Sequence, residues 1–198
     1  MKRNPCRWLL CLMVVASLSQ GAAAAALPSA VVALVPAGAQ VSSPTFAKSR
    51  FFADIAFSAE KKLSANHNAT YNFHLLCNDT KSPLWKMQGP IYQADEANKI
   101  NARRKSFSVG TNPPITYDPV VETKYPWGTG FTQRVVHHYM GAGTGPDTIE
   151  YHAEYIGMIG GSIFELSANG VLTANEAYQW AKIVAEKAGT LNPANIGN

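Results

Sequence analysis

The sequence predicts a single α+β domain in which an antiparallel sheet is packed by helices. Two observations lead to this prediction. Residues 131–167 contain three strand-like segments separated by glycine-rich turns, a pattern typical of an antiparallel meander. Residues 173–188 follow with apolar positions at helical spacing, which indicates a helix with one side packed on the sheet. We therefore expect the chain to be organised around residues 131–189.

Each strand of the predicted meander has its own signal. Residues 131–140 alternate imperfectly, but aromatic and β-branched side chains dominate them. Residues 141–146 contain three glycines and a proline, so the chain must turn there. Residues 149–159 alternate cleanly between apolar and polar, as a strand with one wet face does. A Gly-Gly pair predicts a two-residue hairpin turn into a short strand at 162–166, which we expect to be an edge or return strand.

The closing helix has recognisable ends. Thr173 is a suitable N-cap, and Glu176 completes the pattern of a capping box. Gly189 is a suitable left-handed residue at the C-terminal end. The small residues on the inward stripe predict a close approach of the helix to the sheet; they are Ala177, Ala181, Val184 and Ala188.

The first half of the domain gives weaker signals. Residues 45–63 carry apolar side chains at helical spacing and predict an N-terminal amphipathic helix; these side chains are Phe52, Ile55, Ala59 and Leu63. Residues 71–77 indicate a strand with Tyr71, Phe73 and Leu75 inward. Residues 83–90 are interpreted as irregular, and residues 95–105 indicate a polar surface helix. Residues 27–44 are interpreted as a linker or first strand. The single domain then spans residues 45–192, with a flexible tail at 193–198.

Residues 1–26 have the three parts of an export signal. A basic start precedes an apolar run at residues 8–18, and Gly21 followed by alanines offers a cleavage site after Ala26. The apolar run is shorter than the ~20 residues of a membrane span. The sequence therefore predicts a periplasmic or secreted protein of a bacterial envelope, with no stable membrane span after signal cleavage.

The charge balance and the cysteine content exclude some classes of function. Cleavage after Ala26 removes three of the 17 basic residues and none of the 13 acidic ones, which leaves 14 against 13. The one basic cluster, residues 103–105, is explained by a solvated helix end, so we expect no nucleic-acid partner. Cys77 is then the only cysteine left, which excludes an internal disulfide; we interpret it as a buried small apolar residue.

The stretch at residues 107–130 is rich in proline, glycine and aromatic residues. One interpretation is a recognition surface formed by this stretch with the 141–146 turn. The other is a lid in which Tyr125 and Trp127 fold back over the core. The binding residues predicted under the first interpretation are Tyr117, Tyr125, Trp127 and Thr144.

The two strands before and after the 141–146 turn carry imidazole and carboxylate groups. If they pair as a hairpin, several of these groups share one face and form a candidate zinc or copper site. The residues of this alternative are His137, His138, Glu150 and His152. The competing interpretation is an exposed polar face with cross-strand His–Glu pairs.

The sequence contains no recognised nucleophile motif such as G-x-S-x-G, and it predicts no cofactor apart from the metal alternative. The layout of residues 131–189 resembles the Mog1/PsbP fold, whose small exported members often act as accessory proteins; this likeness assigns no residues. We therefore expect a non-catalytic binding protein whose partner is another envelope or secreted protein. The alternative is a metal-binding protein or metal-dependent enzyme.

Overall fold

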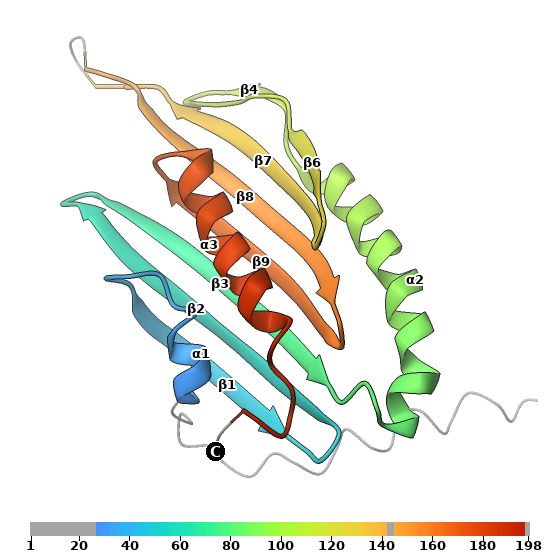
Figure 1. Cartoon of the computed structure of the whole chain (residues 1–198). Coiled ribbons are helices and arrows are strands. Elements are labelled where there is room, and N and C mark those ends of the chain that lie inside the picture. Colours follow the sequence, from blue (N-terminus) through green and yellow to red (C-terminus); the bar gives the residue numbers. More distant parts are fainter. Residues whose placement is uncertain (1–26, 142–144, 197–198) are drawn as a thin grey trace, which may run out of the picture.

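The computed structural model describes residues 27–141 and 145–196 as one α+β domain, which confirms the predicted class. Its sheet has nine antiparallel strands in the order β1-β2-β3-β9-β8-β7-β5-β4, with β6 also paired to β7 (Figure 1). The elements are α1 (Ser29–Val32), β1 (Gln40–Lys48), β2 (Phe52–Ser64), β3 (His67–Asn78), α2 (Pro83–Ser106), β4 (Gly110–Asn112), β5 (Ile115–Tyr117), β6 (Val121–Tyr125), β7 (Gly128–His137), β8 (Thr148–Ile159), β9 (Ser162–Val171) and α3 (Ala174–Ala188).

The predicted meander is present as β7, β8 and β9, which are neighbours in chain order. Ile159 pairs with Ser162 across the two-residue turn, and Gly160 has a φ of +60°, a value that favours glycine. The third strand is longer than expected. It is also central, because β9 pairs with β3 on its other side, so of the two alternatives, edge or return strand, the edge strand is wrong.

The predicted N-terminal helix at 45–63 is wrong, because this stretch forms β1, a turn and β2. In β2 the buried side chains alternate along the strand; they are Ala53, Ile55, Phe57 and Ala59. The same sequence satisfies a helical stripe and a strand alternation. Pairing decides between them, because Phe57 lies opposite Phe73 on β3 and the two rings stack with centroids 4.6 Å apart.

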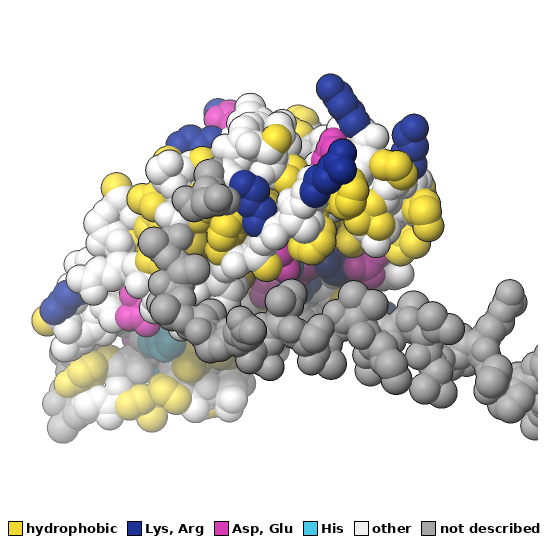
Figure 2. Space-filling model, turned by 90° about the horizontal axis from the view of Figure 1, so that it is seen from below, with side chains coloured by type: hydrophobic (Ala, Val, Ile, Leu, Met, Phe, Trp, Pro, Cys, Tyr) yellow, Lys and Arg dark blue, Asp and Glu magenta, His cyan; other side chains and the backbone are white. Residues whose placement is uncertain are grey.

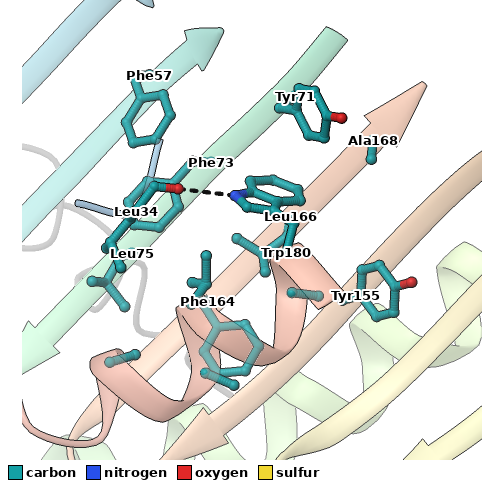
Figure 3. Packing of buried hydrophobic residues seen from close by; sticks show 14 of the residues in the cluster. Leu34, Phe57, Tyr71, Phe73, Leu75, Tyr155, Phe164, Leu166, Ala168 and Trp180 are labelled. Carbon is teal, nitrogen blue, oxygen red and sulfur yellow. Dashed lines mark hydrogen bonds between the residues drawn. The ribbon is translucent and has the colours of Figure 1, made fainter. Parts of the chain in front are cut away.

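The core lies between one face of the sheet and α3, as Figure 1 shows for the helix in front of β8 and β9. Figure 3 shows aromatic and aliphatic side chains from β2, β3, β8 and β9 that point toward this helix. The inward faces of β3 and α3 were predicted correctly. The members of those two faces are all buried; they are Tyr71, Phe73, Leu75, Ala177, Ala181, Val184 and Ala188.

The ends of α3 agree only partly with the prediction. The Thr173 hydroxyl accepts a hydrogen bond from the backbone N–H of Glu176 at 3.1 Å, which confirms the N-cap. Gly189, however, has a right-handed φ of −62°. A Cβ atom at this position would lie 3.1 Å from Cδ1 of Ile159, a tight contact that a small shift of the Ile159 side chain would relieve.

The helix α2 is much longer than the predicted polar helix at 95–105. It begins directly after Ser82, whose hydroxyl accepts a hydrogen bond from the N–H of Trp85, and Pro83 occupies the first helical position. The interpretation of residues 83–90 as irregular was therefore wrong. Of all residues of α2, only Gly89 is buried.

Three further segments are more ordered than the sequence indicated. Residues 107–130 supply the short strands β4, β5 and β6 and the start of β7. Residues 27–44 form α1 and the start of β1. At the other end, Ile196 is buried in the core, so the predicted flexible tail packs against the domain at least up to this residue. Within the described ranges, no helix combines the length and the apolar character that a bilayer-crossing helix needs.

Candidate functional site

The aromatic residues predicted to form a recognition surface pack against the core. Tyr125 and Trp127 stack on each other with ring centroids 4.7 Å apart, and Tyr125 also stacks on Tyr178 of α3 at 5.2 Å. Trp127 further contacts Tyr155 and Phe164. Both rings are only half-exposed and belong to the shell of the core. This is the lid arrangement, the second of the two interpretations of this stretch.

The other two predicted binding residues do not extend this surface. Tyr117 lies on β5, where it is half-buried and pairs with Gly110 of β4. Thr144 lies outside the residues that the structure describes. The four predicted binding residues are therefore not brought together into one exposed patch of the described chain.

The hairpin of β7 and β8 does bring together three of the four residues predicted as metal ligands. The Oε1 atom of Glu150 accepts hydrogen bonds from Nε2 of His137 and Nε2 of His152, each at 3.0 Å. His67, which the sequence did not suggest, adds a third imidazole, with its Nε2 atom 3.9 Å from Oε2 of Glu150. Glu150 is the centre of this imidazole–carboxylate cluster, and its side chain is only 15% exposed.

His67 approaches Glu150 across an intervening strand. It belongs to β3, whereas Glu150 belongs to β8, and β9 runs between them. Gly170 of β9 has a φ of +74°, and its carbonyl oxygen lies 2.6 Å from Nε2 of His67. A side chain at Gly170 would clash with the carbonyl oxygen of Asn68, so glycine permits this close approach. The link between sequence-distant strands explains why sequence reasoning missed His67.

The hydrogen bonds in the cluster control the charge of Glu150. The bond from His152, supported by that from His137, lowers the pKa of Glu150 to about 2, although burial acts in the opposite direction. Glu150 is therefore an anion over the whole physiological range. Chemically, the cluster holds a partly buried carboxylate by imidazole donors and ties β7, β8 and β3 together.

His138 does not join this cluster. Its Nε2 atom lies 2.8 Å from Oγ1 of Thr116, and its Nδ1 atom lies 3.0 Å from Oδ2 of Asp147. Hydroxyl, imidazole and carboxylate follow one another in the order of a catalytic triad. The side chains of His138 and Asp147 are 41% and 45% exposed, unlike the water-excluded setting in which such hydroxyls become nucleophiles. We interpret the arrangement as a structural tie between β5 and the hairpin.

The geometry of the described residues also bears on the metal alternative. Across residues 27–141 and 145–196, no group of three or more His, Cys, Asp or Glu side chains has an arrangement that could hold a metal ion. The donors around Glu150 form hydrogen bonds to the carboxylate instead. Zinc or copper binding at these residues stays a prediction from the sequence.

An exposed apolar surface lies where the sequence reasoning placed irregular chain. Met87 and Ile91, one helical turn apart on α2, are 71% and 65% exposed. On another face of the helix, the ring of Trp85 stacks on Tyr92 and lies over Gly89, where a Cβ atom would be 3.2 Å from the indole. We call the exposed surface of Met87 and Ile91 the α2 apolar patch. The signal that could have revealed it was the i, i+4 spacing of Met87 and Ile91 behind the Ser82–Pro83 helix start.

The other half of α2 is fixed by ion pairs to the sheet face opposite α3. Lys99 contacts Glu165 of β9, and Arg103 contacts Glu154 of β8 at 3.0 Å. The neighbouring Arg104 contacts Glu122 of β6 at 2.7 Å. These pairs hold this half of the helix against the central strands β8 and β9 and against β6. The helix is therefore anchored through polar contacts while its apolar patch stays outside the core.

Comparison with known proteins gave no match: no protein-family model fits the sequence, and neither a curated protein nor a solved structure is significantly similar to the chain. The class of protein is therefore set by its own fold, a single α+β domain with one nine-stranded antiparallel sheet.

Proposed function

We propose that this chain is an exported, non-catalytic binding protein that recognises another protein of the bacterial envelope through the α2 apolar patch. The observation that carries the proposal is the exposure of Met87 and Ile91 on a helix that buries only Gly89. Apolar side chains at i and i+4 are the anchors by which a helix binds an apolar groove. Export is supported by the signal pattern of residues 1–26.

The surroundings of the patch indicate the chemistry of the partner. Lys86, the residue before Met87, and Lys81, just ahead of the start of α2, are both exposed. Figure 2, which views the molecule from the end at which α2 begins, shows hydrophobic side chains gathered on that side with basic side chains next to them. A complementary protein surface therefore has an apolar groove bordered by acidic side chains.

Export is tested first. The full chain is expressed in a bacterial host, and the cell fractions are analysed with N-terminal sequencing of the product. We expect a periplasmic or secreted product that begins at or near Leu27. A product that keeps its first residues and stays in the cytoplasm would contradict this part of the proposal.

Binding is tested with the mature chain, residues 27–198, used for affinity capture from the envelope fraction of its own host. The informative variant combines Met87→Ser with Ile91→Ser, and Val121→Ser, at a 61% exposed position on β6, is the matched control. We expect one stoichiometric partner that the double variant loses and the control keeps, with circular dichroism unchanged in both. A partner captured equally by all three proteins would place binding elsewhere.

A further inference from the structure

A pocket of about 320 Å³ lies beside α3, on the side of the domain where α1 ends. Leu34, Val35 and Pro36 form one apolar wall, and Trp180 and Ile183 of α3 form the other. The indole N–H of Trp180 donates a hydrogen bond to the carbonyl oxygen of Leu34 at 2.9 Å, which holds the two walls together (Figure 3). An apolar pocket of this size with a few polar groups is the usual form of a small-ligand site.

Three polar side chains meet at this pocket. Nζ of Lys61 lies 2.9 Å from Oε1 of Glu176, and the hydroxyl of Tyr71 donates to the same oxygen at 3.0 Å. Burial raises the pKa of Glu176, but the hydrogen bonds from Lys61 and Tyr71 outweigh it and lower the pKa overall. Glu176 is thus held as an anion by the other two groups. The O–H of Tyr71 is used in this contact, whereas the ammonium of Lys61 has three donors and gives one of them to Glu176.

The charges around the pocket favour a ligand whose head group is an anion that accepts hydrogen bonds. Lys187 donates a hydrogen bond from Nζ to the carbonyl oxygen of Ala33, another residue of the pocket wall, at 3.3 Å. Two ammonium groups, Lys61 and Lys187, therefore stand near the pocket against the single carboxylate of Glu176. We propose that the pocket binds a small monocarboxylate with an apolar tail, whose carboxylate accepts from Lys61 while the tail lies between Trp180 and the residues after α1.

The test uses hexanoate with the mature chain and two matched probes. Hexylammonium has the same tail with the opposite charge, and acetate has the same head without the tail. We expect hexanoate to shift the indole N–H resonance of Trp180 and the backbone amides of residues 33–37 in a saturable way in ¹⁵N-resolved NMR spectra. Shifts of equal size with hexylammonium, or saturable shifts confined to other parts of the chain, would overturn the proposal.

Two variants test separately the charge of Lys61 and the apolar wall of the pocket. Lys61→Met is expected to weaken hexanoate binding by about tenfold, the loss of one charge-assisted hydrogen bond. Lys62→Met is the control, because Lys62 is exposed and the alternation of β2 turns it to the other face. Ile183→Ser, at a 45% exposed wall position, is expected to weaken binding while the fold is kept. Unchanged affinity in both Lys61→Met and Ile183→Ser would contradict the assignment.

Discussion

The indole of Trp180 and the carbonyl oxygen of Leu34 form a buried hydrogen bond of 2.9 Å between residues 146 positions apart. It joins α3 to the first segment of the domain. Trp180→Phe removes the donor and leaves a buried carbonyl without its partner. We expect the free energy of unfolding to fall by about 1–3 kcal/mol. Denaturant unfolding monitored by circular dichroism measures this loss, and Trp85→Phe on the exposed helix α2 is the control, for which we expect a smaller effect.

Trp127 distinguishes the lid from the recognition surface. Trp127→Ala removes a ring that stacks on Tyr125 and contacts Tyr155 and Phe164. Because the ring is half-buried, we expect a loss of about 2 kcal/mol in unfolding free energy, below that of a fully buried aromatic. Unfolding in urea measures the loss. A variant of unchanged stability that no longer captures its partner would instead support the recognition surface.

The hydroxyl of Tyr155 is a buried polar atom with no hydrogen-bond partner among the described residues. Its desolvation is therefore not compensated by a protein group. We expect Tyr155→Phe to be neutral or to stabilise the protein by about 1 kcal/mol. Thermal unfolding of the variant measures this directly. A large drop in melting temperature would mean that the hydroxyl makes a contact that the described residues do not show.

The cluster around Glu150 predicts a specific pH dependence. The pKa of Glu150 is about 2 in the folded state, below the value of about 4.3 for an unfolded glutamate. Its contribution to stability is therefore complete above the unfolded value and is lost as the pH falls toward 2. We expect Glu150→Gln to lower the unfolding free energy at neutral pH by about 1–3 kcal/mol and to reduce the acid-dependent loss. The exposed Glu186→Gln is the control; an identical acid profile in Glu150→Gln and the wild type would contradict the prediction.

Cys77 is completely buried, and burial raises the pKa of its thiol to about 11. The reactive thiolate is therefore scarce at pH 8, and the sulfur is shielded from solvent. We expect no reaction with a disulfide reagent such as dithionitrobenzoate in the native mature chain, and one thiol per chain in concentrated guanidinium. Gln93→Cys, exposed on α2, is expected to add one thiol that reacts in the native protein. Rapid native labelling of Cys77 itself would show that the site opens.

Several elements could be predicted because their signals are local. The alternation of residues 149–159, the glycine turn before Ser162 and the alanine stripe of α3 each fit one structure only. The candidate hairpin cluster was partly predictable for the same reason: Glu150 and His152 share a face by alternation, and His137 lies on the neighbouring strand. His67 was not, because its approach depends on the conformation of Gly170 on an intervening strand.

The sequence by itself thus determined the class of the fold, the meander, the closing helix with its buried stripe, and the export-signal pattern. The tertiary structure decided what local patterns left ambiguous. Residues 52–63 satisfy both helical and strand periods, and pairing with β3 selects the strand because it stacks Phe57 on Phe73. The tertiary structure also decided which large apolar side chains pack and which are exposed. Trp127 fits against Phe164 and becomes part of the lid, whereas the ion pairs of α2 leave Met87 in solvent.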